Sequence, residues 1–314
     1  MTPSLLIDNL KVDFLAGGKL VNSPLRGISL SIEAGKTLGI VGETGCGKTL
    51  TALSVMGILP ASARQSGSIS LAGKLLSAED LALIRGREIA MIFQNPHSAF
   101  NPVFTIKQQL HFVAQGRGYS LAEENSLVAD RFAAVGLHDV SRVLTSYPYE
   151  LSGGMLQRCM IAMALLSNPK VLIADEPTTA LDATIAKQVL ELLRKLQQEQ
   201  DFAMLFISHD VSAVARVSDT IAVLYAGKVV ESGDCESVLK SPKHPYTRGL
   251  LGAIPSATKA RGTLSAIPGV VPTTTLEIEG CAFASRCSEA NSQCRQSPLL
   301  LRRGNSNVAC WQVH

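Results

Sequence analysis

The sequence lacks several features that mark particular classes of protein. No apolar run approaches the roughly 20 residues that a helix needs to cross a bilayer. The first ten residues contain Asp8 and show no basic start followed by an apolar core, so no secretory signal is expected. The net charge is only +3, which gives no reason to expect nucleic acid as a partner. We therefore expect any attachment to a membrane to depend on partner proteins.

Cysteine is scarce over most of the chain. Three of the seven cysteines precede residue 281, and their spacing is not that of a small disulfide scaffold, which favours a reducing cytosol. The other four lie close together in the sequence, at Cys281, Cys287, Cys294 and Cys310. Such a cluster in a cytosolic chain is more often a metal site than a disulfide framework, and four thiolates suit Zn²⁺ or an iron–sulfur cluster. A set of reduced structural cysteines is the alternative.

Residues 42–49 read GETGCGKT and follow an apolar strand pattern at 38–41. This is the G-x-x-x-x-G-K-T motif in its strand–loop–helix setting, where backbone N–H groups surround phosphates. Lys48 is expected to reach the β- and γ-phosphate oxygens and the Thr49 hydroxyl to coordinate Mg²⁺. A thiol at a helix N-terminus tends to have a lowered pKa, which we expect of Cys46. The predicted nucleotide-binding residues of this loop are Gly42, Glu43, Thr44, Gly45, Cys46, Gly47, Lys48, Thr49 and Leu50.

A second stretch rich in motifs runs from 151 to 182. A turn of small residues stands just before a helical run, at Ser152, Gly153 and Gly154. The start of a helix offers free N–H groups to an anion. An apolar strand pattern at 170–175 ends in Asp175 and Glu176, as a buried parallel strand does when it brings acids to the carboxyl edge of a sheet. Asp182 then precedes an amphipathic helix.

In this order the motifs resemble the ATP-binding subunits of ABC transporters: a phosphate loop, a signature turn, a Walker B strand and a D-loop. The resemblance includes Gln94, which follows an apolar strand pattern at 89–93 and matches the Q-loop. It also includes His209, which follows a strand pattern at 203–207 and matches the H-loop. The family therefore implies ATP and Mg²⁺ as cofactors and ATP hydrolysis as the reaction.

The resemblance also assigns roles to individual residues. Glu176 is the implied general base toward the attacking water. The implied catalytic residues are Glu176, His209, Gln94 and Lys48. The implied magnesium ligands are Thr49, Gln94 and Asp175. Ser152, Gly153 and Gly154 are expected to act at the nucleotide of a facing protomer, and Asp182 is a further expected nucleotide-binding residue. Phe14 either stacks on adenine or is an aromatic residue of the core.

The implied fold is a mixed α/β P-loop NTPase with a parallel sheet around the phosphate loop, an antiparallel β-subdomain, a helical subdomain and a C-terminal extension. We place the ATP-binding domain at 1–240, its helical subdomain at about 95–167 and the extension at 241–314. Within the helical part, 106–115 and 121–135 carry apolar residues at helical spacing. The segment 95–102, with an exposed-looking Phe100, is expected either to touch membrane subunits or to be a rigid solvent loop.

The extension resembles that of peptide and nickel importers. The implied function is therefore ATP-driven import at the cytoplasmic face of the bacterial inner membrane, with short peptides placed ahead of nickel or a nickel–chelate. The implied partners are two membrane-spanning permease subunits, a second ATP-binding subunit that is either a copy or a paralogue, and, indirectly, an extracytoplasmic substrate-binding protein. The wide cysteine spacing, together with the resemblance to dipeptide importers, favours a [4Fe–4S] cluster over zinc.

Two other classes of function compete with transport. A non-transport ABC ATPase would carry a long coiled coil or a second ATPase domain in the same chain, and the sequence shows neither. A purely regulatory nucleotide-binding module would be expected to lack a catalytic residue, whereas each expected residue is present here.

Overall fold

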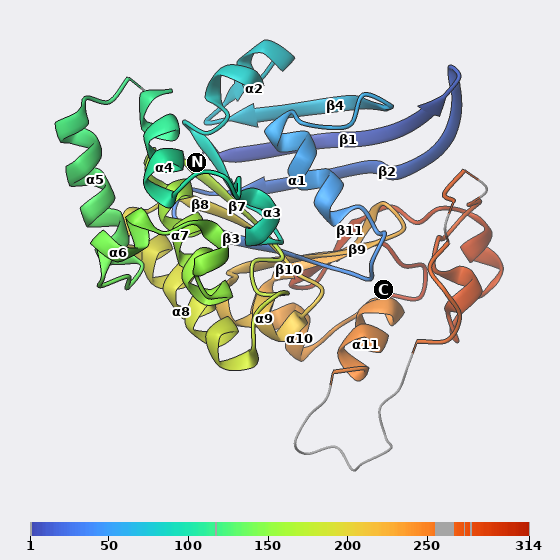
Figure 1. Cartoon of the computed structure of the whole chain (residues 1–314). Helices are drawn as coiled ribbons and strands as arrows, with labels where there is room; N and C mark the ends of the chain where they lie inside the picture. The colour runs from blue at the N-terminus through green and yellow to red at the C-terminus, as the bar shows by residue number, and fades with distance from the viewer. Residues whose placement is uncertain (1, 117, 255–266, 273, 277, 314) are drawn as a thin grey trace. The chain divides into compact units, whose positions relative to one another are not determined.

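The computed structural model describes residues 2–116, 118–254, 267–272, 274–276 and 278–313 (Figure 1). The chain folds into two compact units. The first unit comprises Met1–Glu33, Thr37–Leu76 and Phe206–His314, and the second comprises Ala34–Lys36 and Ser77–Leu205. Within the described residues, no helix has the length and apolar character needed to cross a membrane.

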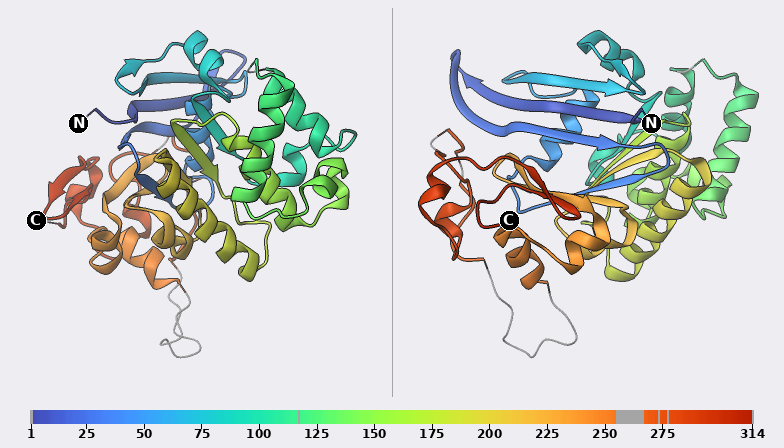
Figure 2. Two further views of the ribbon diagram at one scale, coloured as in Figure 1. Left: turned by 90° about the vertical axis from the view of Figure 1, so that its left-hand side faces the viewer. Right: turned by 180° about the vertical axis from the view of Figure 1, so that it is seen from behind.

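The first unit contains the predicted antiparallel sheet, with strands in the order β2-β1-β4-β5. Its strands are β1 (Leu5–Ala16), β2 (Lys19–Ile32), β4 (Ala63–Leu71) and β5 (Lys74–Leu75). Along β1, Leu5 and Ile7 are buried while Leu6 and Asp8 are more exposed, which is the alternation that the sequence predicts. An irregularity in the pairing between Ile7 and Leu10 then shifts the alternation by one residue, so that Leu10 and Val12 are buried. Figure 2 shows the three long strands side by side.

A second set of strands in the first unit runs in the order β11-β12-β10-β9-β3. The strands are β3 (Thr37–Val41), β9 (Thr220–Tyr225), β10 (Lys228–Asp234), β11 (Leu301–Arg303) and β12 (Ser306–Val308). β3 lies parallel to β9, and β9 and β10 form the predicted hairpin around Ala226 and Gly227. The extension therefore does not merely follow the sheet: its β12 pairs antiparallel with β10.

Short helices complete the first unit. They are α1 (Lys48–Met56), α9 (Val211–Val217), α10 (Cys235–Lys240), α11 (Pro245–Gly252), and the 3₁₀ turns η2 (Ala284–Arg286) and η3 (Ser292–Arg295). The start of α11 is held by the buried carboxylate of Glu231, which accepts the backbone N–H groups of Lys243 and His244 at 2.9 Å each. Because α11 is fixed to β10 in this way, the first part of the extension has a defined place beside the sheet.

In the second unit, β6 (Ile89–Ile92) and β7 (Val171–Asp175) are parallel, and every residue of both is buried. β8 (Ala203–Ile207), whose last two residues belong to the first unit, follows the helix α8 (Ala183–Gln200). The other helices are α2 (Ala78–Ile84), α3 (Pro96–Ala99), α4 (Ile106–Gln115), α5 (Leu121–Ala134), α6 (Val140–Thr145) and α7 (Gly153–Leu165), with the 3₁₀ turn η1 (Pro148–Glu150).

The helix boundaries follow from capping residues. Thr105 and Ser120 begin α4 and α5 with capping boxes, which satisfy free N–H groups at each start. Gly136 follows α5 with a φ of 73°, a conformation that glycine adopts without steric cost. The boundary predicted at residue 240 does not coincide with a division between the two units, and it stays a prediction.

Candidate nucleotide site

The phosphate loop joins β3 to α1 within the first unit, as predicted. A Cβ atom added to Gly42 would lie 2.3 Å from the carbonyl oxygen of Leu224. One added to Gly47, whose φ is 106°, would lie 2.4 Å from Cδ2 of Leu25. Both glycines are therefore required by close packing as well as by backbone conformation.

The start of α1 is suited to an anion. The helix is capped by Gly47, which has no side chain that could accept hydrogen bonds from the first N–H groups. Thr44 and Gly45 lie exposed in the loop before it. The buried Lys48 Nζ donates to the carbonyl oxygens of Gly42 at 2.8 Å and Glu43 at 3.2 Å. The loop itself thus holds the ammonium group that is predicted to bind phosphate.

Cys46 differs from the expectation. Its side chain is fully buried, and burial raises the pKa of the thiol, an effect larger than the opposing influence of the nearby Lys48 charge. Its carbonyl oxygen accepts the N–H of Gly227 at 3.2 Å. The predicted lowering of the Cys46 pKa is therefore wrong, because the side chain points into the core and not toward the solvent at the helix end.

The predicted acids lie at the end of β7 in the second unit, with Asp175 as its last residue and Glu176 directly after it. Asp175 is buried at the strand end. Glu176 has a φ of 47°, an uncommon conformation for a non-glycine residue, and its Oε2 accepts from Gln94 Nε2 and from Thr179 Oγ1 at 2.9 Å each. The structure therefore brings Gln94 and Glu176 together. Thr179 is not among the predicted residues, although its position three residues after the acid is a signal for a local turn.

The signature turn and the D-loop also meet in the second unit. Ser152 caps α7 by accepting the N–H of Met155 at 3.3 Å, and its side chain is exposed. Asp182 caps α8 by accepting two N–H groups, those of Thr184 and Ile185, at 3.0 Å each. A Cβ atom on Gly154 would lie 2.9 Å from Cγ2 of Ile185, so this glycine allows the two helix starts to pack closely.

Two other predicted residues lie in the first unit with the phosphate loop. Phe14 lies half-buried on β1, opposite Asn22 and Ala63 in the two neighbouring strands. His209 lies exposed in the turn between β8 and α9. The role assigned to each stays a prediction.

The phosphate loop contacts two residues that are not among the predicted site residues. The Glu43 side chain pairs with Arg286, and the Glu43 backbone N–H donates to the Tyr246 hydroxyl at 2.9 Å. Both partners belong to the C-terminal extension, more than 200 positions along the chain. They form no motif with the loop, so no pattern in the sequence signals them.

The four clustered cysteines lie within electrostatic reach of one another. Burial raises the pKa of Cys281, Cys287 and Cys310, and neighbouring thiols add to each effect. The sulfur of Cys287 accepts the backbone N–H of Glu289, and the sulfur of Cys310 accepts that of Gln312, each at 3.4 Å. Across the described parts of the chain, however, no three Cys, His, Asp or Glu side chains are arranged to hold a metal ion.

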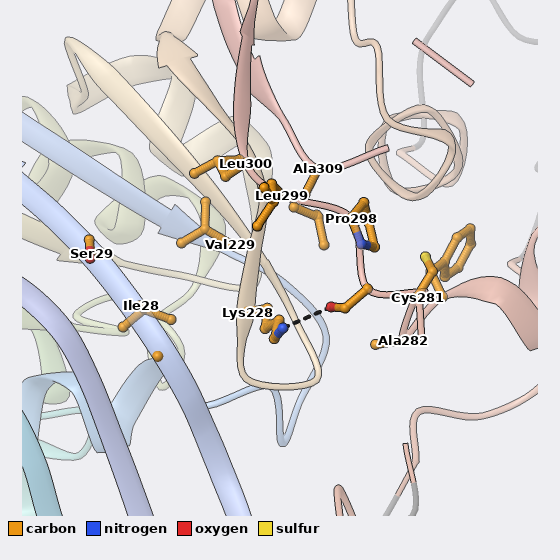
Figure 3. A pocket seen from close by; sticks show the side chains of 14 residues that line it. Ile28, Ser29, Lys228, Val229, Cys281, Ala282, Pro298, Leu299, Leu300 and Ala309 are labelled. Carbon is orange, nitrogen blue, oxygen red and sulfur yellow. Dashed lines mark hydrogen bonds between the residues drawn. The ribbon is translucent and has the colours of Figure 1, made fainter. Parts of the chain in front are cut away.

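A cavity of about 380 Å³ lies between the extension and the sheets of the first unit (Figure 3). Ile28 of β2 and Val229 of β10 line it, with Cys281, Leu299 and other residues of the extension on the other side. In it, Lys228 Nζ donates to Ser297 Oγ at 2.9 Å. No predicted nucleotide-binding residue lines this cavity.

Phosphate loop, acid-bearing parallel strand and glycine signature turn together define an ATP-binding cassette. Comparison with known proteins agrees. Residues 25–179 match the family model described as ABC transporter, and residues 230–294 match the one described as oligopeptide/dipeptide transporter, C-terminal region. Among solved structures, a dimeric ATP-binding cassette, MJ0796 bound to ADP and Pi, superposes with a TM-score of 0.64 at 24% identity, covering 74% of this chain and 98% of that one. The cassette cbiO1 of Clostridium perfringens reaches 0.66 at 25%, covering 80% and 96%.

Curated relatives match along nearly the whole length. The dipeptide transport ATP-binding protein DppD of Bacillus subtilis is 40% identical, with 99% of this chain and 95% of that protein aligned. The probable D,D-dipeptide transport ATP-binding protein DdpD of Escherichia coli is 42% identical, with 98% and 96% aligned. The chain therefore belongs to the ATP-binding subunits of ABC transporters, in the branch that carries the oligopeptide/dipeptide C-terminal region, and it is an ABC-type ATPase.

Proposed function

We propose that this chain hydrolyses ATP to drive the import of short peptides. The observation that carries the proposal is the similarity to peptide-transport ATP-binding proteins over both the cassette and the extension. The relatives named above carry dipeptide in their names, which favours peptides over nickel or a nickel–chelate. Substrate specificity itself belongs to the partner proteins, because this subunit meets the nucleotide and not the cargo.

In the proposed reaction, the residues of the chain position the nucleotide and the attacking water. Residues 42–49 surround the phosphates, and Lys48 leaves its loop carbonyls to contact the γ-phosphate. Thr49, Asp175 and Gln94 are the side chains that suit Mg²⁺, which when bound neutralises charge on the phosphates. Glu176 accepts the proton of the attacking water, in the orientation given by Gln94 and Thr179.

A second ATP-binding subunit is proposed to complete the site. The chain holds one phosphate loop and one signature turn, and the exposed Ser152 at the start of α7 is available to a facing protomer. The solved MJ0796 cassette, whose fold this chain shares, is a dimer. ATP hydrolysis by the purified chain, measured alone and after mixing with a paralogue, decides whether the partner is a copy or a paralogue. If the partner is a copy, the purified chain must hydrolyse ATP alone.

The proposed contact with the permease subunits involves exposed apolar side chains of the second unit. Phe100, expected to be exposed, is 4% exposed and belongs to the core. The exposed apolar side chains of this unit include instead Val103 at 69%, Phe112 at 53% and Tyr149 at 67%. Ile106 donates its N–H to the carbonyl of Ser146 at 3.0 Å, which brings the segments carrying these side chains together. Contiguous exposed apolar patches mark protein–protein contacts, and these side chains are the candidates for such a patch.

A metal site in the extension is the remaining part of the proposal. By their chemistry four thiols within mutual electrostatic reach are a donor set for a [4Fe–4S] cluster or for zinc, although no three of them are placed to hold a metal ion in the part of the chain that the structure describes. Protein purified without oxygen is expected to be brown and to contain about four iron and four sulfide per chain for a full cluster. Colourless protein with one zinc favours zinc, and metal-free protein with a folded tail refutes both.

The central test of the proposed function uses the assembled transporter. The chain is co-expressed with its permease partners, reconstituted in vesicles with its binding protein, and assayed for phosphate release at what is proposed to be the cytoplasmic face. Dipeptide-loaded binding protein is expected to stimulate ATP hydrolysis, and nickel-loaded protein is expected not to. Stimulation by nickel alone, or failure of the chain to co-purify with membrane subunits, contradicts the proposal.

A further inference from the structure

Arg286 of the extension is held by every hydrogen bond that its guanidinium can donate. Its Nη1 and Nη2 donate to the two carboxylate oxygens of Glu43 at 2.8 and 3.1 Å. Its Nε donates to the carbonyl of Pro268 at 2.7 Å, and the remaining N–H groups reach Tyr225 Oη at 3.4 Å and the carbonyl of Ile267 at 3.5 Å. A guanidinium has five N–H donors, so all are used, and two form a bidentate pair with a residue of the phosphate loop.

The pair lies in a setting that strengthens it. The Arg286 side chain is 4% exposed and that of Glu43 30% exposed, so water screens the pair only partly. The guanidinium carbon lies 5.7 Å from the ring centre of Tyr225 and 6.0 Å from that of Phe283. Hydrogen bonding to Glu43 raises the pKa of Arg286 and keeps it charged. A rotation of Arg286 away from Glu43 would therefore leave several buried groups unpaired.

Tyr246 holds the same loop residue by its backbone. Its hydroxyl oxygen accepts the N–H of Glu43 at 2.9 Å, and its ring is fully buried, 4.7 Å from that of Tyr225 and 5.3 Å from that of Phe283. Tyr246 is fixed in turn because His244 Nδ1 accepts its backbone N–H at 3.0 Å. The start of α11 thus fixes the position of the Tyr246 hydroxyl relative to the phosphate loop.

These contacts of Glu43 also affect Lys48. The carbonyl oxygen of Glu43 is one of the two acceptors of the Lys48 ammonium group, at 3.2 Å. Each hydrogen-bonding group of Glu43 therefore has a partner. Its side chain binds Arg286, its N–H binds Tyr246 and its C=O binds Lys48. A shift of Glu43 would move the beginning of the loop and the resting place of its lysine together.

We propose that Arg286 and Tyr246 are positioning residues for the phosphate loop, so that the extension sets the affinity of the cassette for ATP. The inference rests on the proposed nucleotide site at 42–49. Arg286 acts in two ways. It fixes the loop, and it neutralises a carboxylate that would otherwise face the negatively charged phosphates, since like charges at short range oppose binding. Tyr246 acts only by geometry.

The test measures KM, kcat and the dissociation constant for MgATP on the purified full chain with its partner subunit. Arg286→Ala is expected to raise KM and the dissociation constant about tenfold, because one charge-assisted pair is lost. The kcat at saturating ATP is expected to stay within about twofold, since Glu176 and Gln94 are untouched. Tyr246→Phe removes only the acceptor oxygen and is expected to raise KM by about threefold.

Controls separate positioning from folding. Glu43→Gln removes the partner charge, so adding Arg286→Ala to Glu43→Gln is expected to change KM by less than about twofold. Arg295→Ala removes an exposed arginine from the same extension and is expected to leave KM unchanged. If Arg286→Ala reduces the yield of folded chain, Tyr246→Phe tests the same link alone.

Several results would overturn the inference. An unchanged KM in both Arg286→Ala and Tyr246→Phe rules it out. So does an Arg286→Ala effect of equal size with and without Glu43→Gln, because that indicates a general loss of structure. If instead Lys48→Ala binds MgATP like the wild type, the proposed nucleotide site itself is wrong, a failure that is recognised separately.

Discussion

Gln94 donates its side-chain Nε2 to Glu176 Oε2 across 2.9 Å, and this hydrogen bond joins the end of β6 to the end of β7. Thr179 Oγ1 donates to the same oxygen at the same distance. One carboxylate oxygen thus has two donors from the chain itself, so the orientation of the proposed general base is set by the fold.

Glu176→Gln is expected to bind ATP and barely hydrolyse it. The amide keeps the size of the side chain but cannot accept a proton, and loss of a positioned base costs about 10²–10⁴ in rate. Phosphate release and gel filtration with ATP check this, since an ATP-bound dimer is expected to accumulate. Turnover near the wild-type rate would remove Glu176 from its role.

Thr179→Val tests whether orientation matters apart from the base itself. Valine keeps the shape of threonine without the hydroxyl that donates to Glu176. We expect kcat to fall about tenfold, because one hydrogen bond to a charged group is lost. The affinity for ATP is expected to be unchanged. Thr178→Val, at the neighbouring position, serves as the matched control. Equal effects of the two substitutions would contradict a specific role.

Lys48→Ala and Ser152→Arg are expected to fail at different steps. Without the ammonium group held at the loop, Lys48→Ala should lose ATP binding to the single protomer. Ser152→Arg places a long side chain at the exposed start of α7 and should block hydrolysis while the single protomer still binds ATP. Nucleotide titration beside phosphate release separates the two. Loss of binding in both variants would argue against a site shared between protomers.

Cys46 is expected to resist alkylation in the folded chain, with or without ATP. Its side chain is fully buried and burial raises its pKa, so little thiolate is present or accessible at neutral pH. Peptide mapping after iodoacetamide treatment checks this, with the half-buried Cys287 of metal-free protein as the internal comparison. Labelling of Cys46 as fast as Cys287 would show that the loop opens on its own.

The stability of the chain is expected to fall as the pH drops below about 6.5. Burial, followed by the charge of Arg248, lowers the pKa of His244 to about 4. Between these values the unfolded chain binds a proton that the folded chain does not, so acid favours unfolding. From pH 6.5 to 5 this one group lowers the free energy of unfolding by about 1.6 kcal/mol.

His244→Asn provides the comparison for that pH dependence. Asparagine can still accept the N–H of Tyr246 as a helix cap but has no proton to gain. The free energy of unfolding of this variant, from urea titrations at several pH values, should depend less steeply on pH than that of the wild type. An equal pH dependence of the two free energies of unfolding would show that protonation of His244 does not destabilise the folded chain.

Local patterns make much of this fold predictable. The bounds of α4 and β8 agree with the sequence prediction, because caps and apolar periodicity act over a few residues. The acids at the end of β7 are recognisable for the same reason. The predictions for Phe100 and Cys46 are wrong, since the burial of these side chains depends on residues distant in the sequence. Arg286 carries no local signal at all, because its partner Glu43 lies 243 positions away.

The pairing of β12 with β10 has a consequence for where the chain can be cut. A protein ending at residue 240 would leave β10 with a row of unpaired N–H and C=O groups, a template on which other chains can add strands. In the full chain the edge strand on the β10 side is instead β11, which has three residues, two of them arginines. A short, charged border strand discourages such addition. The extension therefore protects this edge of the sheet from strand addition by other chains, and a minimal cassette made by truncation should be prone to aggregate.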